Sequence, residues 1–464
     1  MSEILFQYEG VNPTSWAYLS SLLTIALFFK FNRVFCVRNF DLLLLVLLAP
    51  GLLCVAYGSD PVAASDPGIA ERASIVARVG YLWLMGVNVF LLARMMLDSA
   101  MVRRPLLEPN LSFGGLTFLA ASLLLFLTTN VLTGSPAGSD LDAVQRAEYL
   151  SHRATSDLEG ATLNTHGPGF PFLFLLPHIS TKSLIEAQDT APADAARVED
   201  PADSGRLEAN AATARLMAIL CQSTIVIGIL LIARQHFDNA VLGVAASTLY
   251  LLLPYTAIWT GNVTHALPGA LIVLAVLCYR RPIASGVMIG LACGTIYYPF
   301  ALLPLWIAFY WRRGARRFVA GVVAALLLLV ATLVFTSSDT AMLIARLQQM
   351  LGLRMPIFEG LSGVWAFWNG WYRVPLIVTF AGLSLSFAIW PAQKNLATLL
   401  SGTATLMVGV QFWHAHSGGI ALAWYLPFLL LTVFRPNLED RVAREVVAPS
   451  RWARSRHDEA TAAL

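Results

Sequence analysis

An acidic pair, Asp140 and Asp142, has the clearest chemical potential in this sequence, because it closely follows a long apolar run. A carboxylate at the edge of a membrane is partly desolvated, and a charged neighbour adds to that effect, so its basicity rises. Such a group is suited to general-base catalysis. The alternative is structural, with Ser139 or Asp140 capping the start of a short helix.

Histidines form a second group of candidates. His414 and His416 have the H-x-H spacing that, together with a third histidine, can bind zinc or another divalent cation. The same two residues are followed by Ser417 and two glycines, so an ordinary polar turn is the alternative. The segment therefore has two interpretations, a metal site and a turn.

The stretch 337–372 combines basic and aromatic side chains. We expect a helix near 341–353 that carries Arg346, with Arg354 and Arg373 further along the chain. Arginines beside aromatic rings could hold a lipid-linked phosphate or a sugar ring. The alternative is that the tryptophans form the aromatic belt found at membrane boundaries. These tryptophans are Trp365, Trp368 and Trp371.

The amino-acid composition indicates what kind of protein carries these residues. The chain has 464 residues, of which 57% are apolar and 13% are charged, and its mean hydropathy is +0.65. A soluble domain has about 25% charged residues. The low charge and the long apolar runs exclude a soluble enzyme, a nucleic-acid-binding protein and a disordered protein. The five cysteines have no C-x-x-C spacing, so we interpret them as small core residues.

We therefore predict an all-α, polytopic transmembrane helical bundle of about 13 spans, since one straight span needs about 20 apolar residues. Basic clusters flank both ends of 283–311, which favours two short helices joined at Tyr297–Pro299 over one long tilted helix. The predicted spans are 15–30, 41–57, 79–97, 112–133, 214–233, 239–258, 265–279, 283–297, 298–311, 318–336, 373–390, 396–413 and 419–434.

Polar segments divide this array. We predict an N-terminal three-span module at 1–111, a membrane domain at 112–434 and an Arg-rich tail at 435–464. The membrane domain contains two polar loops, 134–213 and 337–372, and we expect an interfacial helix in each of them.

Basic residues give the orientation. Twenty of the 31 Lys and Arg residues fall on one face of this topology, which the positive-inside rule assigns to the cytoplasm. The formal net charge of +3 is thus a cancellation between a basic inner face and an acidic outer face. We expect a multi-pass protein of the inner or plasma membrane, with its N-terminus outside, its C-terminus cytoplasmic and both polar loops outside. The first apolar segment lacks a signal-peptide cleavage site and is predicted to remain as an anchor.

Four short motifs follow one another within residues 112–434. They are the acidic loop and proline-rich turn from Val131 to Pro171, the pair Gly261-Asn262, the hairpin from Ala284 to Pro299, and Trp424-Tyr425-Leu426-Pro427. In this order they resemble the GT-C glycosyltransferases, which use polyprenyl-phosphate sugars, and most closely the polyprenol-phosphate mannosyltransferase branch. The chain departs from that pattern in its three preceding spans, in its D-x-D spacing, and in Tyr297 and Tyr298 where a lysine is common.

The resemblance implies transfer of a sugar, with mannose as the first candidate, from a polyprenyl-phosphate donor to a glycan, lipid or protein acceptor on the outer face. Asp140 or Asp142 would be the general base of this inverting reaction. No cofactor is implied, although the histidine pair could bind a divalent cation. The partners would be the donor and the lipid bilayer, without nucleic acid. The implied donor phosphate or sugar ligands are Arg146, His166, Arg346, Arg354, His414, His416 and Tyr425.

A transporter or flippase for a lipid-linked or small solute is the alternative function. Transporters tend to have ionisable residues inside their spans and internal repeats, and the predicted spans have few charges and no repeat. The sequence therefore favours chemistry at the membrane interface.

Overall fold

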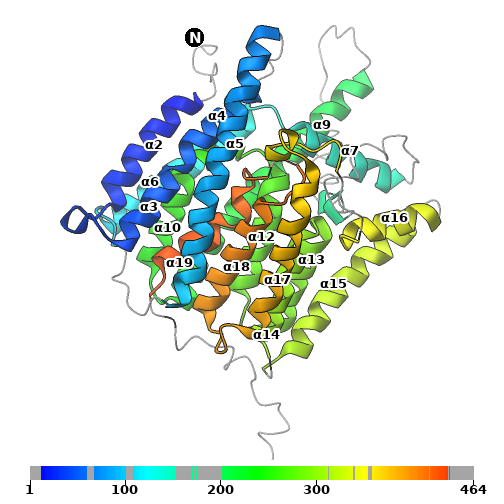
Figure 1. The fold of residues 1–464 in the computed structure, drawn as a ribbon. Coiled ribbons are helices and arrows are strands. Elements are labelled where there is room, and N and C mark those ends of the chain that lie inside the picture. Colours follow the sequence, from blue (N-terminus) through cyan, green and yellow to red (C-terminus); the bar gives the residue numbers. More distant parts are fainter. Residues whose placement is uncertain are drawn as a thin grey trace, which may run out of the picture.

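The computed structural model describes residues 12–59, 67–100, 108–152, 169–171, 173–174, 201–311, 313–337, 340–353, 358–416, 418–436 and 438. This part of the chain is helical, and its only β-type pairing is one isolated bridge between Gly363 and Gly418. Figure 1 shows the helices as one bundle around α18, α19 and α12.

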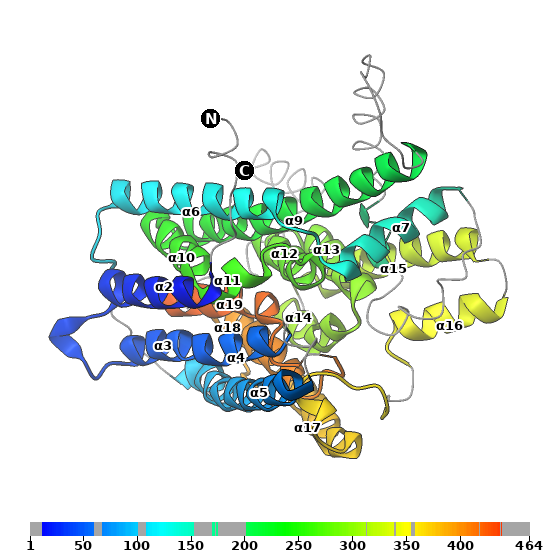
Figure 2. The same cartoon turned by 90° about the horizontal axis from the view of Figure 1, so that it is seen from above.

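The first half of the chain supplies helices at the periphery of the bundle, on more than one side (Figure 2). They are α2 (Pro13–Phe28), α3 (Val37–Val46), α4 (Leu48–Gly58), α5 (Pro67–Met96), α6 (Phe113–Thr133), α7 (Gly138–His152) and α9 (Pro201–His236).

The second half supplies the centre and further helices at the periphery. It contains α10 (Ala240–Leu252), α11 (Pro254–Trp259), α12 (Val263–Leu277), α13 (Pro282–Thr295), η4 (Tyr298–Leu302), α14 (Leu303–Phe309), α15 (Ala315–Thr336), α16 (Thr340–Met350), η5 (Val364–Ala366), η6 (Gly370–Tyr372), α17 (Arg373–Ile389), α18 (Leu396–Gln411), η7 (Leu422–Trp424) and α19 (Leu426–Phe434).

Six helical segments in the described part are long and apolar enough to cross a membrane, which supports the prediction of a helical membrane protein. Five further apolar helices are shorter, so the number of 13 spans stays a prediction. The six long segments are Val37–Gly58, Gly68–Met96, Phe113–Thr133, Leu207–His236, Ala315–Val334 and Gly370–Ile389.

The predicted break inside 283–311 is present. Helix α13 ends at Thr295, Ile296 has an extended backbone, and the short helices η4 and α14 follow. Helix α13 packs closely on α15 because Gly286 and Gly290 lie directly against the α15 backbone near Phe318 and Val322. This pairing places the turn after α13 next to α16, the helix that follows α15.

Helices α18 and α19 form the buried centre. Each residue from Leu396 to Gln411 except Thr398, and each residue from Leu426 to Phe434, is buried, although both helices are short for a membrane span. Asn395 and Thr398 form a reciprocal capping box at the start of α18. A helix that is apolar on all sides must be covered by other helices, and this explains the central position of α18 and α19.

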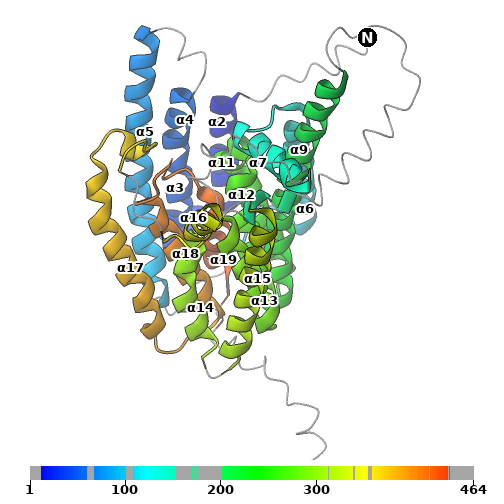
Figure 3. The same ribbon diagram turned by 90° about the vertical axis from the view of Figure 1, so that its right-hand side faces the viewer.

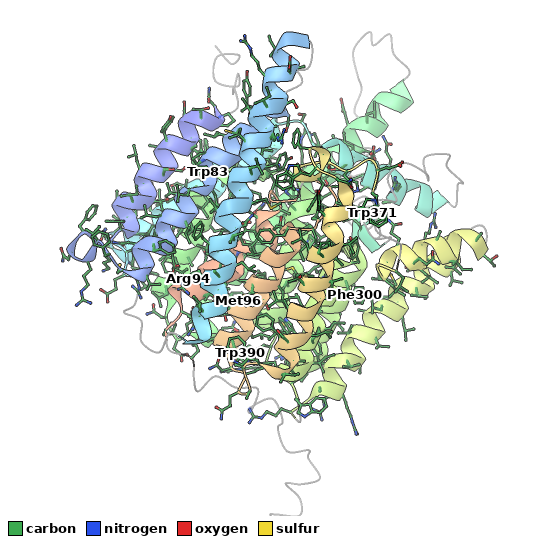
Figure 4. The ribbon with its side chains drawn as sticks, viewed as in Figure 1. Trp83, Arg94, Met96, Phe300, Trp371 and Trp390 are labelled. Atoms are coloured by element: carbon green, nitrogen blue, oxygen red, sulfur yellow. The ribbon has the colours of Figure 1, made fainter. Side chains whose placement is uncertain are left out.

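Two ends of the bundle can be distinguished. Helices α7 and α16, with η5 and the loop before α17, lie toward one end, which we call the site end (Figures 1 and 3). Trp371 and Trp390 lie at opposite ends of α17 (Figure 4), and both are exposed. This pattern agrees with tryptophans at two membrane boundaries, whereas Trp365 is buried in the core.

A buried ion-pair network marks the opposite end, which we call the network end. Arg94 Nε and Nη2 donate to the two oxygens of Asp41 at 2.7 and 2.9 Å, and Arg94 Nη1 contacts Asp98 at 3.1 Å. Arg435 Nη2 reaches the other oxygen of Asp98 at 2.6 Å. The network therefore joins α3 and α5 of the predicted N-terminal module to the residue that follows α19.

Candidate functional site

Asp140 lies in the first turn of α7, where it is fully buried. Its Oδ2 accepts a hydrogen bond of 2.8 Å from the backbone N–H of Val263, the first residue of α12. The residue before α12, Asn262, provides no side-chain cap of its own. Asp140 therefore supplies the carboxylate that an uncapped helix N-terminus attracts.

The alternative that Ser139 or Asp140 caps the start of its own helix is wrong. Helix α7 begins at Gly138, so neither Ser139 nor Asp140 is the residue that precedes it. The N–H of Asp140 donates to the carbonyl of Ala137, as expected for a residue inside the first turn. Asp140 caps a distant helix, and only one of its two carboxylate oxygens is needed for that.

The second oxygen is what makes Asp140 chemically interesting. Its Oδ1 is buried and has no hydrogen-bond partner among the described residues. Burial raises the pKa of Asp140 to about 7, against the opposing effect of the backbone N–H groups of Val263 and Thr264. At neutral pH the carboxyl group is thus divided between its two protonation states, as suits a general base.

Asp142 has a different environment. It is exposed on α7, whereas Asp140 is buried, because residues two apart on a helix point to different sides. Arg146, one turn further along α7, is half-buried. The D-x-D spacing therefore gives one enclosed carboxylate and one solvated carboxylate.

A second group of side chains surrounds the loop after α18. The ring centroids of Tyr298 and His414 are 4.7 Å apart, and those of His414 and Trp424 are 5.3 Å apart. Arg373, at the start of α17, donates from Nε to the carbonyl of Trp413 at 3.0 Å. The loop keeps this shape because Gln411 Oε1 accepts the N–H groups of Gly419 and Ala421.

The electrostatics of the two histidines favour neutral rings. Burial, followed by the nearby His416 and His265, lowers the pKa of His414 to about 3. Burial and Arg373 lower the pKa of His416 as well. His414 Nδ1 accepts the backbone N–H of His416 at 3.2 Å, so the proton of the neutral ring lies on Nε2. His414 is therefore a neutral hydrogen-bond donor.

The metal interpretation receives no support from the described residues, where no group of three His, Cys, Asp or Glu side chains could hold an ion. One nitrogen of His414 is already used by its own loop. A backbone hydrogen bond within an H-x-H segment is what the polar-turn interpretation predicts.

Helix α12 connects Asp140 to the second group. His265, two residues after Val263, has its Nδ1 3.2 Å from the hydroxyl of Tyr255. Tyr255 also hydrogen-bonds to the backbone of Ala423, next to Trp424. We call Asp140, His265, Tyr298, Arg373 and His414 the polar cluster, in which Asp140 is linked to the other members through the start of α12 and His265. Its members come from five separate segments.

Sequence reasoning did not assign His265, Tyr255 or Tyr298 to the site. They stand at the starts of apolar helices, where a polar or aromatic side chain also suits the membrane boundary. The signal that could have found them is positional, since several predicted spans begin with such residues on one face of the membrane.

The other predicted donor ligands make hydrogen bonds to residues outside the polar cluster, or they lie outside the described residues. Arg346 is buried on α16 and donates from Nη1 to Ser337 at 3.3 Å. The Tyr425 hydroxyl donates to Asn88 of α5 at 2.8 Å, so it packs within the core. His166 and Arg354 lie outside the described residues.

The second polar loop nevertheless reaches the cluster through its backbone. The N–H of Ser362 donates to the carbonyl of Ala415 at 3.1 Å, beside the bridge between Gly363 and Gly418. At Gly352, which has a φ of +66°, a side chain would meet the ring of Tyr297. Both polar loops thus border the same end of the bundle.

No known family model matches this chain, and no curated protein sequence is detectably similar to it.

Proposed function

We propose that this chain is an integral-membrane glycosyltransferase in which Asp140 is the general base. The observation that carries the proposal is the buried carboxyl of Asp140, with a pKa near 7 and a second oxygen that has no partner among the described residues. The order of motifs that resembles GT-C enzymes supports the same assignment.

In the proposed step, Asp140 Oδ1 takes the proton of an acceptor hydroxyl. The acceptor oxygen then forms a bond to the anomeric carbon of the sugar, and the bond from that carbon to the phosphate oxygen breaks. Polyprenyl phosphate leaves with the electron pair, and attack from the opposite face inverts the anomeric centre. No covalent enzyme intermediate is required.

The rest of the polar cluster would bind the donor. Arg373 carries a positive charge next to the His414 loop and can stabilise the leaving phosphate. The neutral His414 can donate from Nε2 to a phosphate or sugar oxygen. Of the residues that the resemblance assigns to donor binding, His414 belongs to this cluster and His416 follows it in the same loop, while Arg146 and Arg346 lie on the flanking helices α7 and α16.

The topology belongs to the proposal too. We place the site end outside the cytoplasm and the network end inside, with the N-terminus outside and the C-terminus in the cytoplasm. This orientation rests on the distribution of Lys and Arg among the loops.

The test uses the purified chain in vesicles with a synthetic polyprenyl-phosphate mannose donor and a panel of glycan, lipid and peptide acceptors. We expect acceptor-dependent release of polyprenyl phosphate, lost in Asp140→Asn and kept in Asp142→Asn. Asn preserves the hydrogen bond to Val263 but cannot accept a proton at neutral pH, so loss of fold and loss of chemistry are separated.

Equal transfer by Asp140→Asn and the unmodified chain would remove Asp140 from the mechanism. Uptake or flipping of a labelled solute without any acceptor, unaffected by Asp140→Asn, would instead establish the transporter alternative.

A further inference from the structure

The turn between α2 and α3 is fixed by a single buried side chain, Asn39. Its Oδ1 accepts the N–H of Lys30 at 2.9 Å, and its Nδ2 donates to the carbonyls of Lys30, Arg33 and Val34 at 3.0 to 3.1 Å. Both the oxygen and the nitrogen of the Asn39 amide are thus directed to this turn. The turn therefore has a defined shape.

The outer surface of this turn is apolar and basic. Phe31 is 63% exposed, Val34 is 52% exposed and Phe35 is fully exposed, while Arg33 is exposed between them. The turn projects from the bundle beyond the ends of α2 and α3 (Figure 2). Phenylalanines displayed beside Lys and Arg are typical of a segment that enters the boundary between lipid head groups and acyl chains.

Arg38 follows the turn in the chain, at the second residue of α3, and is only 6% exposed. Its Nε and Nη1 have no hydrogen-bond partner among the described residues. The acidic residues that act on it electrostatically are Asp41 and Glu108. Both oxygens of Asp41 already accept from Arg94, and Glu108 is exposed.

A buried guanidinium needs an anionic partner, and the positive end of a helix dipole increases that need. Phosphate matches the donors of an arginine well. The apolar residues of the turn indicate that the phosphate belongs to a lipid, because a free anion would gain nothing from Phe31 and Phe35.

We propose that this turn and Arg38 bind the phosphate head group of an anionic phospholipid in the leaflet at the network end. Arg38 donates to the phosphate, Lys30 and Arg33 add positive charge around it, and Phe31 and Phe35 enter the acyl-chain region. This site is separate from the polar cluster and does not depend on the proposed glycosyltransferase activity.

The experiment measures lipids retained by the intact chain in native mass spectrometry, after release from nanodiscs that contain equal amounts of phosphatidylglycerol and phosphatidylcholine. We expect preferential retention of phosphatidylglycerol. The preference should fall about fivefold in Arg33→Gln, since one basic residue near the surface contributes about that factor. It should be lost in Arg38→Gln.

Arg317→Gln is the matched control, because Arg317 is an exposed basic residue at the start of α15, away from the turn. Phe35→Ser serves as a second variant that cannot disturb the core, since Phe35 is fully exposed, and it should reduce retention of both lipids. Equal retention of the two lipids by the unmodified chain would overturn the proposal. The proposal would also be overturned if Arg33→Gln and Arg317→Gln reduced the preference for phosphatidylglycerol equally. It would be overturned as well if inorganic phosphate raised the melting temperature of the chain as much as phosphatidylglycerol does.

Discussion

The two ends of the bundle differ in how they hold buried carboxylates. At the network end, the carboxylates of Asp41 and Asp98 are each bound by arginine, and both are almost inaccessible to solvent. At the site end, Asp140 is as deeply buried, yet one of its oxygens has no partner among the described residues. Full pairing is what a structural role requires, whereas an unpaired oxygen is retained where chemistry uses it.

This contrast predicts that removal of charge at the two ends has separate effects, one on rate and one on stability. The largest effect is expected for Asp140→Asn. Loss of a general base should lower the rate of sugar transfer by about 10²- to 10⁴-fold. The melting temperature should not fall at neutral pH, because Asn can still accept the N–H of Val263. Transfer assays and thermal unfolding of the same preparations would measure both quantities.

Arg94→Gln should produce the reverse result. It leaves the buried carboxylate of Asp41 without its two charged hydrogen bonds, and removal of one partner from a buried ion pair costs about 3–5 kcal/mol. We expect a large loss of stability with an unchanged transfer rate per folded molecule. A variant that lost rate without losing stability would remove the distinction between the two ends.

A smaller effect is expected for His414→Phe, which keeps an aromatic ring against Tyr298 and Trp424 but removes the Nε2 donor. A hydrogen bond to a charged group contributes about 1.5–3 kcal/mol, so transfer should fall about 10- to 100-fold. Steady-state kinetics with a titrated donor would measure the loss. His152 is outside the cluster, and His152→Phe, as a control, should leave the rate unchanged.

The stability of Asp140→Asn relative to the unmodified chain should also depend on pH. The folded-state pKa of Asp140 is raised, so its stabilising contribution is complete below about pH 4 and is lost as the pH rises toward 7. Asn carries no such penalty. The melting temperature of Asp140→Asn should therefore rise relative to that of the unmodified chain as the pH increases from 5 to 8. A constant difference would mean that the Asp140 carboxyl titrates in its ordinary range.

Local features of the fold could be predicted from the sequence. The apolar runs indicate helices, and the basic clusters on both sides of 283–311 indicate the break that the chain makes after Thr295. Gly and Pro residues near these breaks act through the backbone of their immediate neighbours. Such signals need no knowledge of distant parts of the chain.

The site could be predicted only in part, because its contacts join distant segments. The sequence marks Asp140 as an acid near an apolar boundary, but its partner Val263 is 123 residues away. Nothing local distinguishes Asp140 from Asp142, since the difference between them is burial by α9 and α12. The ion pair between Arg94 and Asp41 is likewise formed across 53 residues.

The most direct test of the central claim is the pH dependence of sugar transfer by the unmodified chain in vesicles. If Asp140 is the base, the rate should rise about tenfold per pH unit below 7 and become constant above that value. Any residual rate of Asp140→Asn should lack this dependence. A rate that is already constant from pH 5 upward, or the same profile in Asp140→Asn, would contradict the assignment.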